Sequence, residues 1–175
     1  MKLARGRLYL GGRGLAGSAL RRLKVIFAGE SEVGKTSVAA AISAAGLASG
    51  GPTIGADFFV SGPDGVRAVI FDLAGQDRFA PLAPLLSRGA RVVVLIFDVS
   101  RPETLLAIPD WAERVLNGTE GAKVILVGNK LDAGLRVTPE DIASVAAAVG
   151  AHRVILTSAS TGFGLDELRK ELLEA

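Results

Sequence analysis

The stretch FAGESEVGKTS, residues 27–37, joins an apolar run to an alanine-rich segment. Its two glycines, Gly29 and Gly34, allow the backbone to wrap closely around an anion with successive N–H groups pointing inward. A helix that begins after Gly34 adds the positive end of its dipole to the same place. The alternative is an ordinary glycine turn with a surface lysine. A strand before the stretch and a helix after it favour a loop that binds phosphate.

The residues that follow the second glycine extend this interpretation to a nucleotide. We expect Lys35 to reach the β- and γ-phosphates and the hydroxyl of Thr36 to ligate Mg²⁺. The residues of the loop that are expected to bind the nucleotide are Glu32, Val33, Gly34, Lys35, Thr36 and Ser37.

Composition sets broad limits on what the chain can be. Its 175 residues suffice for one domain with a sizeable core, and the 49% of hydrophobic residues fall in runs too short to span a membrane. The absence of cysteine excludes disulfides, cysteine-ligated zinc and lipids attached to cysteine. No signal-peptide pattern is present. These features predict a soluble cytoplasmic protein, with peripheral membrane contact as an addition.

Basic residues are concentrated at the start of the chain. Positions 1–24 hold seven of them and no acidic residue, which leaves 13 basic against 18 acidic residues in the remainder. We therefore expect residues 1–22 to form an N-terminal extension and residues 23–175 to form the domain. The extension is interpreted as a flexible leader or a cap on the domain, or as a segment that binds weakly to an anionic membrane. A third interpretation is a site for a macromolecular partner, and binding of nucleic acid is not expected.

Short runs rich in valine and isoleucine recur at Leu23–Ala28, Val66–Phe71, Val92–Phe97, Lys123–Val127 and Arg153–Leu156. Such runs are typical of parallel strands buried on both faces. Helical segments are predicted at Thr36–Ala45, Pro102–Leu116, Thr138–Val149 and Leu165–Leu173. Turn residues 62–65 join Asp57–Ser61 to the second run, which indicates an antiparallel hairpin. The pattern predicts an α/β fold of three layers, with a six-stranded, mostly parallel sheet, one antiparallel strand and about five helices.

The second predicted strand of the hairpin is followed by polar residues that suit phosphate chemistry. Asp72 can hold Mg²⁺ through a water, and the N–H of Gly75 can meet a γ-phosphate. Gln76 can orient a water for attack in line with the leaving group. The alternative is a turn at a strand end with a solvated glutamine. The phosphate loop upstream favours the functional interpretation.

Residues that could select the base follow the last two strands. The carboxylate of Asp132 can accept hydrogen bonds from N1–H and the 2-amino group of guanine, which adenine lacks. Lys130 can cover one face of the base, and Asn129 can tie the loops together. After the last strand, the N–H of Ala159 can meet guanine O6. The predicted base-binding set is Asn129, Lys130, Asp132, Ser158, Ala159 and Ser160.

Residues from about 23 to 173 resemble a small GTPase of the Ras superfamily, most like its Rab branch. PTIGADF at 52–58 and DLAGQDRF at 72–79 are similar to the switch I and switch II strings of Rab proteins, and RGA at 88–90 and FDV at 97–99 also fit in order. The resemblance implies a P-loop NTPase fold. It also implies that Thr53 ligates Mg²⁺ and contacts the γ-phosphate, and that Gln76 positions the attacking water.

The chain departs from the family in several places. Glu32 stands where many relatives have a small residue, and we expect its side chain to turn outward. Residues 46–51 hold no aromatic side chain to cover the guanine, so Leu47 is the nearest substitute and faster nucleotide exchange is expected. Ser160 stands where relatives often have lysine. The lipidated C-terminal tail of Rab proteins is not found in this sequence.

The resulting hypothesis is a GTP-binding switch that hydrolyses GTP slowly to GDP with Mg²⁺ and signals to protein partners. The predicted catalytic residues are Gln76, Lys35, Thr53 and Gly75, and the predicted metal-binding residues are Thr36, Thr53 and Asp72, the last through water. The alternative is an interaction module that nucleotide stabilises and that hydrolyses negligibly. Activating proteins, exchange proteins and effectors are expected at the switch regions. The candidate effector patch is Phe58, Phe71 and Leu86, which could instead be ordinary core residues.

Overall fold

A six-stranded sheet forms the centre of the molecule. The structure is a computed structural model that describes residues 21–43, 58–61, 66–73 and 83–175. The strands are β1 (Arg21–Ala28), β2 (Phe58–Ser61), β3 (Val66–Asp72), β4 (Val92–Asp98), β5 (Lys123–Asn129) and β6 (Arg153–Leu156). They lie in the order β2-β3-β1-β4-β5-β6, and all neighbours are parallel except β2 and β3. The predicted sheet with its one antiparallel strand is confirmed.

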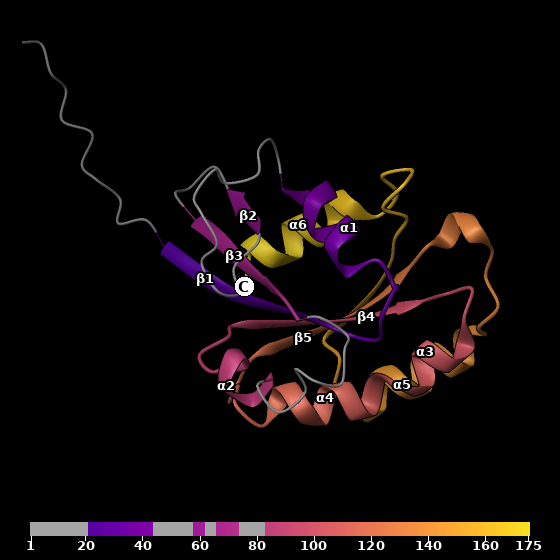
Figure 1. Cartoon of the computed structure of the whole chain (residues 1–175), viewed down its shortest axis with the longest axis horizontal. Coiled ribbons are helices and arrows are strands. Elements are labelled where there is room, and N and C mark those ends of the chain that lie inside the picture. The colour runs from indigo at the N-terminus through magenta and orange to yellow at the C-terminus, as the bar shows by residue number, and fades with distance from the viewer. Residues whose placement is uncertain (1–20, 44–57, 62–65, 74–82) are drawn as a thin grey trace, which may run out of the picture.

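Helices cover both faces of this sheet (Figure 1). They are α1 (Lys35–Ile42), α2 (Ala83–Ser87), α3 (Pro102–Leu106), α4 (Ile108–Leu116), α5 (Pro139–Ala148) and α6 (Leu165–Leu173). Side chains of each strand alternate between the faces, so Val94 and Ile96 pack with α1 and α6, whereas Leu95 and Phe97 pack with α4 and α5. Both cores are apolar, which confirms the predicted three layers.

Local sequence explains where two of the helices begin. Thr138 starts α5 with a capping box, because its hydroxyl accepts a hydrogen bond from the N–H of Asp141 and the Asp141 carboxylate accepts one from the N–H of Thr138. The single helix expected over Pro102–Leu116 is instead two, α3 and α4, which meet at Ala107. Pro109 has no N–H with which to continue the α3 ladder, and it lies in the first turn of the new helix.

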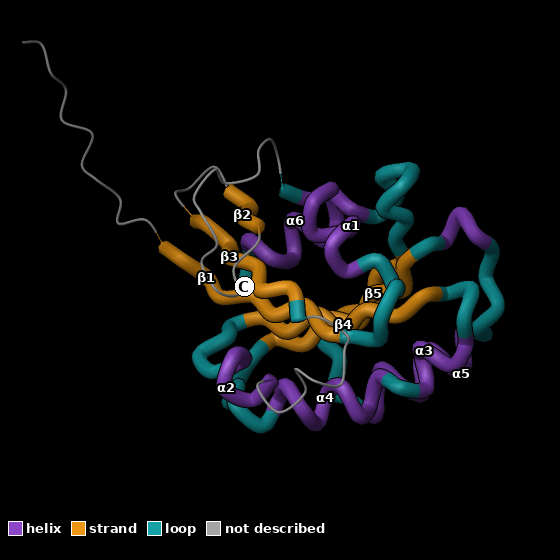
Figure 2. Tube along the Cα trace, viewed as in Figure 1, coloured by secondary structure: helices purple, strands orange, loops and turns teal. Residues whose placement is uncertain are grey.

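Three strands run further than predicted, and each ends on a polar residue. Asp72, Asp98 and Asn129 are the last residues of β3, β4 and β5. At the other end of the sheet, β1 begins at Arg21, two residues before the expected start of the domain. Figure 2 shows the strands as one layer between the helices. Because five strands are parallel, their carboxyl ends meet at one edge, which is where an α/β sheet binds its ligands.

Among the described helices, none is both long enough and apolar enough to cross a membrane.

Candidate functional site

The phosphate loop leaves β1 through a glycine that no other residue could replace without distortion. Gly29 has a φ of 147°, and a Cβ at this position would collide with the carbonyl oxygen of Ile96. The side chain of Lys35 turns back over the loop, where its Nζ donates to the carbonyl oxygens of Gly29 at 2.9 Å and Glu30 at 2.7 Å. Burial lowers the pKa of Lys35, and the carboxylates of Asp72 and Glu30 oppose that shift. The loop therefore carries a buried cation at the start of α1.

Two oxygen groups suited to a divalent cation lie next to this lysine. The hydroxyl of Thr36, in the first turn of α1, donates a hydrogen bond to the carboxylate of Asp72 at the end of β3. Hydroxyl and carboxylate oxygens are the ligands that Mg²⁺ takes when phosphates complete its shell. The two described members of the predicted metal set are thus brought together, and their chemistry fits Mg²⁺.

Asn129 connects the phosphate loop to the loops after β5 and β6. This residue is buried, and its Nδ2 donates to the carbonyl oxygen of Val33 at 2.9 Å. Its Oδ1 accepts from the hydroxyl of Thr157 at 3.1 Å and from the N–H of Ala159 at 3.2 Å. Gly34 lies against the same amide, since a Cβ at Gly34 would collide with Asn129 Nδ2. One side chain therefore fixes three segments relative to one another.

The carboxylate of Asp132 is held in place by two serines. Its Oδ1 accepts from the hydroxyl of Ser158 at 2.6 Å and its Oδ2 from the hydroxyl of Ser160 at 2.8 Å. These hydrogen bonds hold the pKa of Asp132 below its ordinary value. Each carboxylate oxygen has a further lone pair with which to accept from a ligand. Ser160 thus helps to orient the acid.

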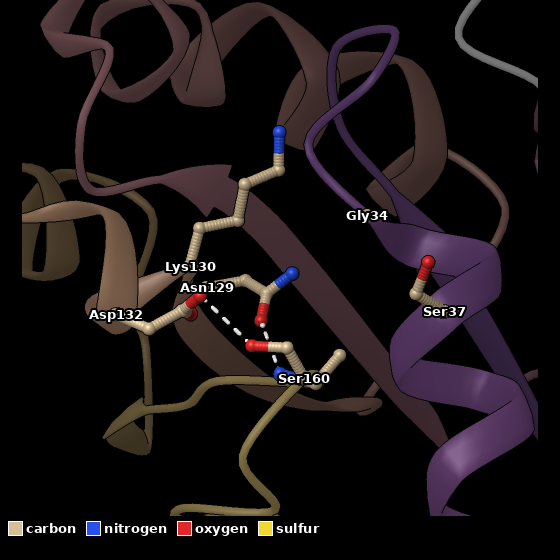
Figure 3. A pocket seen from close by; sticks show the side chains of 7 residues that line it. Gly34, Ser37, Asn129, Lys130, Asp132 and Ser160 are labelled. Carbon is tan, nitrogen blue, oxygen red and sulfur yellow. Dashed lines mark hydrogen bonds between the residues drawn. The ribbon is translucent and has the colours of Figure 1, made fainter.

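A pocket opens between the phosphate loop and these base-side residues. Figure 3 shows Gly34 and Ser37 on the side of α1, facing the residues that follow β5 and β6 across the pocket. Its lining consists of Gly34, Ser37, Asn129, Lys130, Asp132, Ala159 and Ser160. All seven were among the residues predicted to bind nucleotide, although they come from three distant parts of the chain.

The structure also brings in residues that the sequence motifs did not single out. The buried carboxylate of Asp98 pairs with Lys130 Nζ at 2.8 Å and with Arg101 Nε at 3.1 Å. Burial raises the pKa of this carboxyl, but hydrogen bonds from Lys130, Ser100 and Arg101 outweigh burial and lower the pKa to about 2. Phe97-Asp98-Val99 was noted for its place in the family pattern, but no motif indicated these long-range contacts.

A tryptophan contacts the phosphate loop from α4. Trp111, which is 2% exposed, donates from Nε1 to a carboxylate oxygen of Glu30 at 2.9 Å. The guanidinium of Arg114 lies 5.1 Å from the centre of the indole ring. The first residues of the phosphate loop are therefore bonded to the helical layer as well as to the sheet.

Several predicted residues lie outside the part of the chain that the structure describes. They are Thr53, Gly75, Gln76 and Leu47. Of the candidate effector patch, Phe71 and Leu86 are half-buried against the core, with Lys24 Nζ 4.9 Å from the centre of the Phe71 ring. Phe58 pairs with Ile70 through its strand, and its side chain is not described. The patch stays a prediction.

Glu32 adopts a left-handed backbone conformation, with a φ of 63° and an exposed side chain. Such a conformation costs an L-residue about 1–2 kcal/mol, whereas glycine adopts it without strain but loses about 0.5–1 kcal/mol to unfolded-state entropy. We expect Glu32→Gly to raise the free energy of unfolding by about 0.5–1 kcal/mol in urea titrations. The matched control is Ser31→Gly, which should lower it, because Ser31 is not among the described residues with positive φ. Equal effects of the two changes would contradict the strain.

Ionised Asp98 should stabilise the fold in a pH-dependent way. Because its native pKa of about 2 lies below the ordinary value of 3.8, the stabilisation is present above pH 4 and is lost as the pH falls towards 2. The shift corresponds to about 2 kcal/mol. We expect urea unfolding to give a difference of this size between the parent and Asp98→Asn at about pH 6, shrinking by about pH 3. A difference that does not change with pH would show that the charge of Asp98 contributes nothing.

Comparisons with known proteins agree with the geometry of the site. The Ras family matches residues 24–175. Human Ras-related protein Rab-31 is 32% identical over 158 residues, which cover 86% of this chain and 80% of the relative. GTP-binding protein YPT53 of Saccharomyces cerevisiae is 39% identical over 117 residues, 63% of this chain and 53% of the relative. Human Ras-related protein Rab-12 is 29% identical over 161 residues, 87% of this chain and 66% of the relative.

The family match spans both loops of the pocket, the Thr36–Asp72 pair and the full set of described strands from β2 to β6. Ras and Rab GTPases bind GTP or GDP together with Mg²⁺. The chain therefore belongs to the Ras family of small GTPases, with Rab proteins among its relatives.

Proposed function

We propose that this GTPase is a slow molecular switch, which holds GTP between the phosphate loop and the loops after β5 and β6 and converts it to GDP. The observation that carries the proposal is the bridge by Asn129, which bonds Val33 of the phosphate loop and the backbone of Ala159. This bridge sets the phosphate end and the base end of the pocket at a fixed separation. In this proposal, residues 23–175 form the guanine-nucleotide-binding (G) domain.

The base is selected by the side of the pocket that Asp132 lines. Its ionised carboxylate accepts from N1–H and the 2-amino group of guanine, while Ser158 and Ser160 keep it in place. The stem of Lys130 covers one face of the base. The N–H of Ala159 donates to guanine O6 in this proposal, shifting from the 3.2 Å contact with Asn129 Oδ1. Adenine would leave the carboxylate unpaired, at a cost in affinity.

The phosphates lie at the start of α1 in this proposal. N–H groups of residues 32–37 and the Nζ of Lys35 neutralise charge on the β- and γ-phosphates. Thr36 and Thr53 ligate Mg²⁺, and Asp72 holds it through water; the bound cation supplies further charge neutralisation. The N–H of Gly75 contacts the γ-phosphate.

Hydrolysis is a phosphoryl transfer to water. Gln76 aligns the water in line with the leaving group, and loss of the γ-phosphate releases the loops that contain Thr53 and Gly75. Protein partners that sense these loops are the output of the switch. An activating protein can add roughly 10³–10⁵ in rate by supplying an arginine.

A second candidate is an interaction module that binds nucleotide but hydrolyses it negligibly. Glu32 favours this alternative, because it places a carboxylate within the phosphate loop in a left-handed conformation. The two candidates share the nucleotide site and differ only in turnover, so a kinetic experiment separates them.

Single-turnover release of phosphate from bound GTP tests the proposal. We expect the parent to hydrolyse GTP at roughly 10⁻⁴–10⁻³ s⁻¹, the range of intrinsic Ras turnover, and Gln76→Leu to be slower by about 10-fold or more. A non-hydrolysable GTP analogue serves as the binding control and should bind both proteins alike. A parent that binds GTP without turnover would establish the module instead, and a preference for ATP over GTP in competition would refute the guanine assignment.

The basic extension, residues 1–22, is proposed to add a weak contact with anionic membranes. Most of it lies outside the described residues, and the support is its charge, since each basic residue near such a surface contributes about 1 kcal/mol. Liposomes with anionic lipid should retain the full chain at low salt and release it at high salt. Deletion of residues 1–20 should abolish retention while GTP binding persists. Equal sedimentation of both proteins would refute the contact.

A further inference from the structure

Asp98 is a buried carboxylate at the edge of the sheet that forms the site, and its side chain makes four polar contacts there. It ends β4, and its side chain is 2% exposed. Oδ1 accepts from the N–H and the hydroxyl of Ser100, at 2.9 Å and 2.6 Å. Oδ2 pairs with the cations of Lys130 and Arg101. Burying a carboxylate is costly unless it is paired. The two cations on one oxygen of Asp98 offset this cost.

The two cations on Oδ2 come from different segments, Lys130 from the loop after β5 and Arg101 from the loop after β4. Lys130 is part of the base-side loop, where it has a φ of 65°, and its Cε lies 3.9 Å from where a Cβ on Gly34 would be. Arg101 uses its Nη2 to donate to the carbonyl oxygen of Ser31 at 3.1 Å. Asp98 thereby connects the base-side loop to the phosphate loop through side chains alone. We call Asp98, Arg101 and Lys130 the Asp98 clasp.

The contact with Ser31 also sets the direction of the next N–H group. In a trans peptide the carbonyl oxygen of one residue and the N–H of the next point in opposite directions. With the Ser31 carbonyl drawn to Arg101, the N–H of Glu32 points the other way. Glu32 has a left-handed conformation that its own preferences oppose. The guanidinium therefore helps to hold the phosphate loop in a strained shape.

We propose that the Asp98 clasp retains bound nucleotide by holding the phosphate loop and the base-side loop together, with Asp98 and Arg101 as positioning residues. This inference rests on the proposed guanine-nucleotide site. A nucleotide spanning both loops can leave only when one of them moves, so an additional tie between the loops slows its release. Affinity differences within one site arise mainly from dissociation rates.

The test compares release and capture of a fluorescent GDP analogue by the full chain. We expect Arg101→Met and Asp98→Asn each to raise the dissociation rate about 5- to 20-fold, roughly the effect of one hydrogen bond, with association changed by less than about 2-fold. The matched control is Arg153→Met, which removes an arginine paired with Glu167 and Glu171 at the far edge of the sheet and should release GDP like the parent.

Simple charge effects near the phosphates predict a different pattern. Removing the anion of Asp98 leaves the site more positive, which alone would slow release of GDP, whereas the clasp predicts faster release. Arg101→Lys keeps the charge but replaces the two separated nitrogens that bond Asp98 and Ser31 with a single one, so it should also release GDP faster than the parent. In the double variant of Asp98→Asn and Arg101→Met, the increase should be smaller than the product of the single effects.

Three results would overturn the clasp. The first is a GDP dissociation rate in Asp98→Asn that equals the parent's or is slower, and the second is a parental dissociation rate in Arg101→Lys. The third is a set of variants that unfold at a lower urea concentration but release GDP like the parent. The last would indicate a role in stability alone. A parent that binds no guanine nucleotide would instead refute the proposed function, so the two failures are distinguishable.

Discussion

The hydrogen bond from the Asn129 amide to the carbonyl oxygen of Val33 is the contact on which the geometry of the site depends. It joins residues 96 positions apart, is buried, and lies at the carboxyl edge of the parallel strands. Drawing the Val33 carbonyl towards β5 turns the N–H of Gly34 the opposite way, as trans peptide geometry requires. The same amide bonds the segment after β6. The phosphate loop and the segment after β6 are thus both bonded to one side chain at the end of β5.

Close packing around Gly128 restricts how this edge is assembled. A Cβ on Gly128, just before Asn129, would lie 2.8 Å from side-chain atoms of Val99 and Leu156 and 2.9 Å from Phe97. Those neighbours come from the ends of β4 and β6, so β5 can lie between them only with glycine at this position. The backbone that delivers Asn129 is therefore placed by the apolar core, and the polar chemistry depends on steric fit beneath it.

Much of the fold could be predicted because its signals are local. Apolar runs marked the strands, Thr138 marked the start of α5, and the glycines of the phosphate loop marked the approach to α1. The seven residues that line the pocket were also predicted, since each belongs to a short motif at a strand end. The division of the helix at Ala107 also has a local signal, because Pro109 favours the start of a new helix, although the sequence pattern had predicted a single helix.

The contacts of Asp98 could not be predicted, because they depend on distances that only the folded sheet sets. Arg101 meets Ser31 across 70 positions, and nothing in the residues near either one indicates the other. The same is true of Ser158 and Ser160, whose hydroxyls orient Asp132 from the neighbouring strand end. Sequence patterns predicted residues that line the pocket, and the fold shows which side chains hold them in place.

The hydrogen bond between Trp111 and Glu30 makes the protein its own optical reporter. Trp111 is the single tryptophan of the chain, so all indole emission comes from a ring that is bonded to the phosphate loop. The ring is shielded from solvent and lies beside a carboxylate and the guanidinium of Arg114, and charges so close to an indole shift its emission. Rearrangement of the loop around Glu30 changes that electrostatic surrounding. Intrinsic fluorescence can therefore follow the phosphate loop in real time, with no dye attached and no residue replaced.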